Sequence, residues 1–391
     1  MKEQKVCIIG GGLTGLITAI TLARINIKVD LVIKNLNYNF KSRRTTAISQ
    51  ENFNFLKKLD VLKFLEEEFW SCFQMKLYTE TRNEKISEIL NLNKNYKNKI
   101  FYMVDNIKVI KYLIKNIKKE KLITLKLNEE ILNIENSSLL KKIKFKSKRI
   151  EKYNLVILCS GANSNLSKQI FKGDIYEKAY NEIALTVLLQ HKYLQNKTAR
   201  QIFFDNSILA LLPISNTKTS VVWSIKENNF NRNRLKNQIF LKKKILFYAK
   251  NFYKQSKVIS KFEFKNLSLV IRKNYFQDRI LLFGDALHVV HPLAGQGFNM
   301  VLRDLFNLEK ILRKKVNLGL DIGSSDVLYE FSNEIKSKNF LYSLGIDFIR
   351  KFFTTKNKSF KTIRNKLITR VNREKIIKDF FFTLANKGLK F

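Results

Sequence analysis

The sequence predicts an α/β fold, in which a Rossmann-like domain with a parallel sheet is interleaved with a sheet-rich second domain and followed by a helical C-terminus. Three observations predict it. A strand, a glycine turn, a helix and a second strand follow one another over residues 5–33. Further apolar runs at 154–161 and 279–285 also lead into glycine. Strand-like segments dominate 180–225, whereas residues from 297 onward have helical spacing.

The N-terminal elements form a βαβ unit. Residues 5–10 (KVCIIG) are a short apolar run that ends in glycine, and residues 13–25 carry apolar positions at helical spacing. Residues 28–33 (KVDLVI) read as the second strand. Two strands joined through a helix are typical of a parallel sheet with a right-handed crossover.

The middle of the chain alternates between helical and strand patterns. Residues 52–69 predict an amphipathic helix and residues 106–119 a Lys-rich helix, while residues 75–80 and 100–104 predict strands. Farther on, LALLPI and SVVWSI predict a pair of strands, and residues 234–254 predict a basic amphipathic helix.

Proline marks no linker, because the chain has only Pro213 and Pro292. We therefore expect two interleaved domains rather than consecutive ones. The predicted bounds are 1–75, 100–175 and 265–330 for the first domain, 76–99 and 176–264 for the second, and 331–391 for the helical C-terminal region.

The formal net charge of +40 is spread from Lys2 to Lys390 and accompanies no nucleic-acid-binding motif, so we expect no nucleic-acid partner. Such a basic surface also suits an anionic membrane face. Met1 and four polar residues lead directly into a strand, and no uncharged apolar run reaches the roughly 18–20 residues of a spanning helix. The sequence predicts a cytoplasmic protein, with peripheral attachment to the inner face of the cytoplasmic membrane left open.

The glycine turn of the βαβ unit has the pattern G-x-G-x-x-G. Gly10 permits the tight turn, Gly12 lets the backbone approach a pyrophosphate, and Gly15 lets the helix pack closely on the strand. The helix N-terminus adds free N–H groups and a positive dipole end. We therefore predict a dinucleotide site whose candidate residues are Gly10, Gly12, Leu13, Thr14 and Gly15.

The second strand departs from the usual pattern, in which an acidic residue at its end bonds the ribose. Ile33 and Lys34 occupy those positions here. Asp30 comes too early in the strand, so we do not count it as a ligand.

The second motif covers residues 279–304, RILLFGDALHVVHPLAGQGFNMVLRD. Asp285 follows a buried strand and can accept hydrogen bonds from the hydroxyls of a ribityl chain. The Gly295–Gly297 turn opens the next helix, and its N–H groups can stabilise negative charge on a reduced flavin. The candidate residues are Gly284, Asp285, Pro292, Gly295, Gln296, Gly297, Phe298 and Asn299.

This segment resembles the GD motif of FAD-dependent aromatic-ring hydroxylases without a separate NADPH domain. Its HxxHP form and the following AGQGFNxxxRD are similar to the ubiquinone-biosynthesis hydroxylases in particular. The Arg43–Ser49 segment resembles the family's arginine-bearing segment, which places Arg44 at the FAD. By the same resemblance, Asn106 lies near the cofactor and Gly161 follows the second strand-turn, where Ser160 replaces the family's aspartate.

The resemblance implies FAD as cofactor and NAD(P)H as transient reductant. In this family O2 adds at the flavin C4a, and the resulting hydroperoxide hydroxylates a phenol ring. The implied substrate is a hydrophobic prenylated phenol, and the implied partners are other ubiquinone-biosynthesis proteins and the membrane surface. Two alternatives stay open: another single-component flavin hydroxylase with a small soluble substrate, and a non-catalytic FAD-binding scaffold of the biosynthetic complex.

No side chain is assigned as a catalytic acid or base. His288 and His291 favour a structural role in the GD segment over catalysis, and their spacing offers no third metal ligand. The aromatic and basic residues of 339–391, for example Phe352–Phe353 and Phe380–Phe382, fit two interpretations equally: an interfacial amphipathic helix, or a helical bundle that covers the flavin domain.

Overall fold

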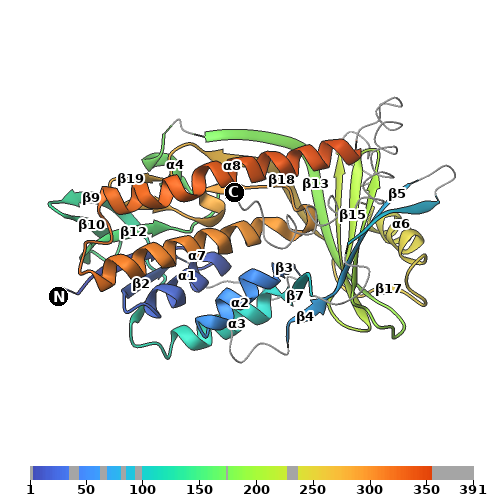
Figure 1. The fold of residues 1–391 in the computed structure, drawn as a ribbon, viewed down its shortest axis with the longest axis horizontal. Coiled ribbons are helices and arrows are strands. Elements are labelled where there is room, and N and C mark those ends of the chain that lie inside the picture. Colours follow the sequence, from blue (N-terminus) through green and yellow to red (C-terminus); the bar gives the residue numbers. More distant parts are fainter. Residues whose placement is uncertain are drawn as a thin grey trace.

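The computed structural model describes residues 3–34, 44–61, 68–80, 85–92, 99–172, 175–226 and 237–354. These residues form an elongated molecule, with a mainly parallel sheet toward one end and a large, mainly antiparallel sheet at the other (Figure 1). Two long helices run between the two ends.

The first sheet holds the strands that the glycine motifs follow. Its order is β19-β20-β12-β1-β2-β8, and all neighbours are parallel except β19 and β20. Helices α1 (Leu13–Ala23) and α3 (Asn106–Ile117) pack together against it. Its strands are β1 (Lys5–Ile9), β2 (Lys28–Ile33), β8 (Ile123–Leu127), β12 (Leu155–Leu158), β19 (Phe276–Gln277) and β20 (Ile280–Leu282).

Two small antiparallel sheets flank it. One follows the order β11-β10-β9 and contacts β1 and β12; its strands are β9 (Ile131–Ser137), β10 (Leu140–Phe145) and β11 (Ile150–Tyr153). The other follows the order β3-β7-β4 and comprises β3 (Thr45–Ser49), β4 (Trp70–Cys72) and β7 (Phe101–Asp105). Helix α2 (Gln50–Lys58) continues directly from β3.

The large sheet follows the order β21-β18-β13-β16-β15-β14-β5-β6, with β17 paired to β13. Helix α6 (Gln238–Ala249) packs on this sheet through Leu241, Ile245 and Tyr248, while the short α4 (Asn165–Ile170) precedes β13. The strands are β5 (Gln74–Glu80), β6 (Ile86–Leu92), β13 (Ile175–Gln190), β14 (Thr198–Phe204), β15 (Ser207–Pro213), β16 (Lys218–Lys226), β17 (Lys257–Val258), β18 (Glu263–Arg272) and β21 (His288–Val289).

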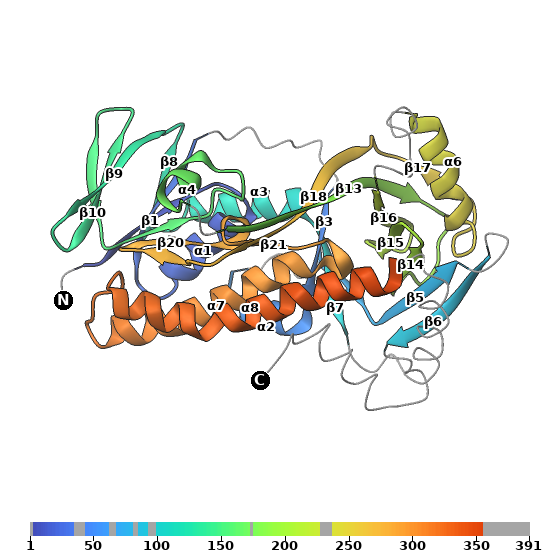
Figure 2. The same cartoon turned by 90° about the horizontal axis from the view of Figure 1, so that it is seen from above.

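Helices α7 (Gln296–Asn317) and α8 (Ser325–Thr354) lie side by side and link the two ends of the molecule (Figure 2). α7 contacts α1 and α2, whereas α8 also reaches β14 and β18 of the large sheet. The inner side of α8 buries apolar residues such as Phe331, Ile335 and Ile346, together with the polar residues Asn339 and Arg350. The C-terminal helix therefore packs on both sheets through its own core residues.

The predicted α/β fold class and the pairing of LALLPI with SVVWSI, in β15 and β16, are confirmed. The helix predicted over 52–69 is wrong in length. It ends at Lys58, because Asp60 adopts a positive φ of 53° and the chain has become a strand by Trp70. The domain bounds remain a prediction.

Part of the predicted C-terminal region, residues 355–391 with Phe380–Phe382, lies outside the described residues, as does Arg43. No helix in the described ranges is long and apolar enough to cross a bilayer. Neither observation decides between the membrane and bundle interpretations of the C-terminal segment.

Candidate functional site

Three neighbouring parallel strands, β1, β12 and β20, each run into a turn that contains glycine, and these turns meet at one edge of the sheet. Gly10 lies directly against the end of β12. Its φ is 130°, and a Cβ atom there would sit 2.5 Å from the carbonyl oxygen of Cys159. Gly10 is therefore required by both backbone conformation and packing.

The two glycines at the start of α1, Gly12 and Gly15, differ in whether packing requires them. A Cβ atom on Gly15 would lie 1.9 Å from the carbonyl oxygen of Gly10, so Gly15 is needed for close packing of helix on strand. Gly12 is the exposed N-cap residue, and a Cβ atom there would meet nothing within 4 Å. The backbone at Gly12, with Leu13 and Thr14 behind it, is thus open to a ligand at the positive end of the helix.

The GD segment packs directly on this helix start. Gly284 has a φ of 66°, and a Cβ atom there would lie 2.7 Å from Cγ2 of Thr14. The next residue, Asp285, is exposed in the short helix η4 (Gly284–Ala286). The first and second glycine motifs therefore form one surface, which carries an exposed carboxylate beside a helix N-terminus.

The turn before α7 packs on strand β3. Gly295 is the N-cap of α7 and adopts the left-handed conformation, with φ of 67°; a Cβ atom there would lie 2.8 Å from Cβ of Ala47. Helix η5 (Leu293–Gly295), preceded by Pro292, leads into this turn. Gln296 accepts a hydrogen bond from the Tyr342 hydroxyl of α8.

Asn299 holds the first turn of α7 against the β3–α2 connection. Its side-chain amide donates to the carbonyl oxygen of Ala47 at 2.9 Å, and its Oδ1 accepts from the N–H of Ser49 at 2.8 Å. The Asn52 amide also donates to Oδ1 at 2.9 Å. These bonds give the buried Asn299 side chain a role in positioning the turn, and its contact with the cofactor remains a prediction.

We expect Asn299→Ala to lower the free energy of unfolding by about 2 kcal/mol, because it leaves buried groups of Ala47, Ser49 and Asn52 without this partner. The measurement is urea unfolding of the FAD-loaded protein. Asn307→Ala on the same helix is the control, since among the described residues its amide bonds the Arg303 carbonyl of its own helix, at 3.0 Å. Equal losses in the two variants would contradict the positioning role.

The remaining predicted residues lie around the same surface. Asn106 accepts a hydrogen bond from the Thr46 hydroxyl at 2.6 Å, next to Ala47. Arg44 is half-exposed and pairs with Glu263 of β18 at 3.3 Å. Gly161 has a φ of 83° and open space at its Cβ position. Two further predicted residues line the turn: Gly297, whose Cβ would make ordinary contact with Val290, and Phe298, which packs on the core.

Lys34, where the usual acidic residue is missing, and Asp30, which we do not count as a ligand, have different surroundings. Lys34, directly after β2, pairs with Glu130 from the connection between β8 and β9, so a carboxylate does lie there, from another part of the chain. Asp30 is buried and ion-paired with Lys5 at 2.9 Å and Lys126 at 3.4 Å. Its carboxylate is therefore part of the core beneath β11, in line with its exclusion as a ligand.

Both histidines of the GD segment are buried and face carboxylates of other elements. His288 Nε2 lies 2.7 Å from Asp304 of α7, which also accepts from Asn339 of α8 at 3.0 Å. His291 Nε2 lies 3.1 Å from Glu182 of β13, and burial lowers the pKa of His291 below its ordinary 6.5. Both histidines thus link the GD segment to other elements, which supports the expected structural role.

Arg272 also anchors the GD segment, although the sequence does not single it out. It is 2% exposed at the end of β18, and its Nε donates to the Ala286 carbonyl at 3.0 Å. Its backbone N–H bonds the carbonyl of Leu287. An arginine in an apolar strand is the only signal that could have drawn attention to it.

Comparison with known proteins identifies a family. The model of the family described as "FAD binding domain" matches residues 3–319. A 3-demethoxyubiquinol 3-hydroxylase of Escherichia coli is 23% identical over 96% of this chain and 97% of its own length. A ubiquinone hydroxylase of Neisseria meningitidis is also 23% identical, over 94% of this chain and 81% of its own.

Solved structures share the fold. A p-nitrophenol 4-monooxygenase from Pseudomonas putida superposes with a TM-score of 0.78 at 14% identity, covering 99% of both chains. A probable FAD-dependent monooxygenase from Pseudomonas aeruginosa superposes with a TM-score of 0.74 at 14% identity, covering 94% of this chain and 100% of its own.

Proposed function

The chain belongs to the FAD-binding domain family and is an FAD-dependent monooxygenase, and from this premise we propose that it hydroxylates the ring of a polyprenylated phenol in ubiquinone biosynthesis. The observation that carries the proposal is the match to two ubiquinone-pathway hydroxylases over more than nine-tenths of this chain.

The geometry supports the cofactor part of the proposal. Gly12 leaves open space at the N-terminus of α1, Asp285 presents a carboxylate beside it, and Gly295 brings the α7 N-terminus to the same region. We propose that these features hold the pyrophosphate, the ribityl hydroxyls and the flavin ring in turn. Arg44 and Asn106 complete the proposed binding surface from the β3–β7 side.

The packing supports the substrate part. Ala210 and Leu212 of the large sheet belong to the same apolar cluster as Leu293, next to the Gly295 turn. An apolar wall beside the proposed flavin position suits a substrate with a long hydrocarbon chain.

FAD, reduced by NAD(P)H, supplies the oxygen chemistry when bound. The contribution of this chain is to bind the cofactor, exclude water and orient the ring. The helix N-termini at Gly12 and Gly295 additionally stabilise negative charge. The main alternative, an FAD-binding scaffold without turnover, predicts cofactor binding with no substrate-dependent oxidation of NADPH.

The deciding experiment is quinone-lipid analysis of cells that lack this chain. We expect an under-hydroxylated prenylphenol to accumulate, and its structure would identify the ring position. In parallel, a soluble prenylphenol should accelerate NADPH oxidation by the purified yellow protein. Normal quinone levels in cells without a second hydroxylase would sink the pathway assignment. FAD binding without any phenol-stimulated NADPH oxidation would favour the scaffold.

A further inference from the structure

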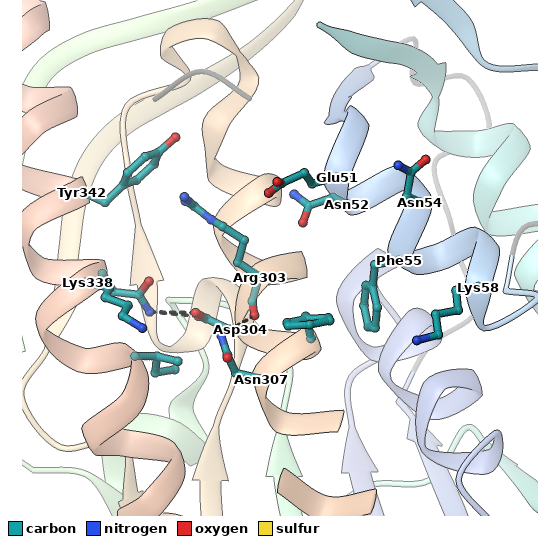
Figure 3. A pocket seen from close by; sticks show the side chains of 13 residues that line it. Glu51, Asn52, Asn54, Phe55, Lys58, Arg303, Asp304, Asn307, Lys338 and Tyr342 are labelled. Atoms are coloured by element: carbon teal, nitrogen blue, oxygen red, sulfur yellow. Dashed lines mark hydrogen bonds between the residues drawn. The ribbon is translucent and has the colours of Figure 1, made fainter. Parts of the chain in front are cut away.

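A pocket lies between α2, α7 and α8 (Figure 3). Its volume is about 480 Å³, within the range of about 300–1,000 Å³ that is usual for small-molecule sites. None of the predicted cofactor residues lines it. The proposed hydroxylation therefore assigns no role to the residues that line this pocket.

One part of the pocket is apolar. Phe55 of α2 and Phe306 of α7 meet edge to face, with ring centres 5.3 Å apart, and Phe306 is 47% exposed. Ile335 of α8 also lines the cavity. A half-exposed phenylalanine at a cavity lined by apolar side chains suits contact with an apolar group of a ligand.

The other part contains a cation whose hydrogen-bonding capacity is not fully used. The Arg303 guanidinium stacks on Tyr342, 4.1 Å from the ring centre, and Figure 3 shows it pointing between Tyr342 and Glu51. Its Nη2 is buried and has no hydrogen-bond partner among the described residues. An unsatisfied buried donor on a charged group is costly, and an anion would remove this cost.

The charged residues around Arg303 determine how many anionic groups a ligand of this pocket can carry. Asp304 is already bonded to His288 and Asn339, and Lys338 is paired with Glu334 at 2.7 Å. Lys58 of α2 lines the cavity on the far side of Phe55 from Arg303, whereas Glu51 lies across from Arg303 and disfavours a second negative charge.

We propose that this pocket binds a small amphiphilic anion: one carboxylate or phosphate group against Arg303, and an apolar body against Phe55, Phe306 and Ile335. Bidentate hydrogen bonding by arginine suits either anionic group.

The pocket is connected to the proposed flavin turn. Tyr342, which stacks on Arg303, donates its hydroxyl proton in the hydrogen bond to Gln296 beside Gly295. An anion that draws the guanidinium away from Tyr342 would alter the surroundings of that turn, so occupancy should perturb the flavin absorption spectrum. This consequence rests on the proposed function, whereas binding itself does not.

The test is isothermal titration of the FAD-loaded protein with octanoate, octyl phosphate and inorganic phosphate. We expect the two amphiphiles to bind and Arg303→Gln to weaken them at least about tenfold, the loss of a charge-assisted bond. The control is Arg313→Gln on the same helix, because Arg313 pairs with Glu309 outside the pocket; it should leave affinity unchanged. Phe306→Ala should weaken both amphiphiles without affecting binding of inorganic phosphate.

The outcomes separate the possibilities. A preference for octanoate or for octyl phosphate identifies the anionic group as carboxylate or phosphate. If inorganic phosphate binds as tightly as octyl phosphate, the apolar wall contributes nothing to affinity and its proposed role is overturned. No binding at millimolar concentration, or equal losses in Arg303→Gln and Arg313→Gln, would overturn the site. If Arg303→Gln does not fold by circular dichroism, the Phe306→Ala result decides instead, and unchanged binding of both amphiphiles by that variant would overturn the site. Binding without a change in the flavin spectrum would remove the connection to the turn but leave the proposed hydroxylation intact.

Discussion

Replacing Arg350 by alanine is expected to lower the free energy of unfolding by about 3–5 kcal/mol, because it removes the buried cation that bonds two buried carboxylates at once. Arg350 of α8 donates to Glu182 of β13 at 2.6 Å and to Asp347 at 3.1 Å. All three residues are 5–6% exposed. This cluster joins the C-terminal helix to the large sheet and, through His291, to the GD segment.

The loss of stability in Arg350→Ala should become smaller as the pH falls. Burial opposes ionisation of both carboxyls, but hydrogen bonds and nearby charges, from His291 and Arg350 at Glu182 and from Lys178 and Arg350 at Asp347, lower both pKa values. They lie below the ordinary 4.5 and 3.8. A lowered carboxyl pKa stabilises the fold above the unfolded value, and this stability is lost as pH falls through the folded value. Protonation also neutralises the two carboxylates of the variant, so the difference in free energy of unfolding between the two proteins should narrow below about pH 4.

Urea unfolding at pH 7 and at pH 3.5 measures both parts of this prediction. Lys351→Ala is the matched control: it removes a cation 3.3 Å from Asp347, but its side chain is 60% exposed. An exposed pair of this kind contributes about 0–1 kcal/mol. If the two variants lose similar stability at pH 7, or if the Arg350→Ala loss does not shrink in acid, the buried cluster does not stabilise the interface.

The parts of the site that the sequence predicts are those in which backbone geometry restricts the residue type. Gly10, Gly284 and Gly295 adopt positive φ values and make close approaches that exclude a Cβ atom, so a glycine pattern reveals them. The strands that precede the first two are apolar and short, which places both turns at one sheet edge. Local sequence is sufficient for this inference because each turn is determined within a few residues.

The parts that could not be predicted depend on which distant side chains meet. Glu182 and Arg350 are 168 residues apart, and their pairing requires both the bulge of β13 at Ala179/Glu182 and the position of α8 along the sheet. Likewise, Lys34 pairs with Glu130 of the segment after β8 because Ile33 lies opposite Leu127 in the parallel register. Periodicity identifies the elements but does not determine such pairings.

Gly12→Ala and Gly15→Ala are expected to separate cofactor binding from folding, although the two residues belong to one motif. A Cβ atom on Gly12 meets nothing within 4 Å, so the protein should fold normally, whereas the added methyl group would occupy the space that we assign to the pyrophosphate. We expect FAD affinity to fall at least about tenfold, or about 1.4 kcal/mol. A Cβ atom on Gly15 would lie 1.9 Å from the Gly10 carbonyl oxygen, so Gly15→Ala should lower the free energy of unfolding by more than about 3 kcal/mol.

FAD titration followed by flavin fluorescence, together with urea unfolding in the absence of FAD, distinguishes these two losses. Gly345→Ala is the control, because this glycine lies within α8 with no atom within 4 Å of its Cβ position. It should leave FAD affinity unchanged and raise the free energy of unfolding by about 0.5–1 kcal/mol, the usual preference for alanine in a helix. If a folded Gly12→Ala protein binds FAD with unchanged affinity, the pyrophosphate does not occupy the space beside Gly12. Neither packing nor backbone conformation requires glycine at this position, so ligand contact is the property that the variant tests.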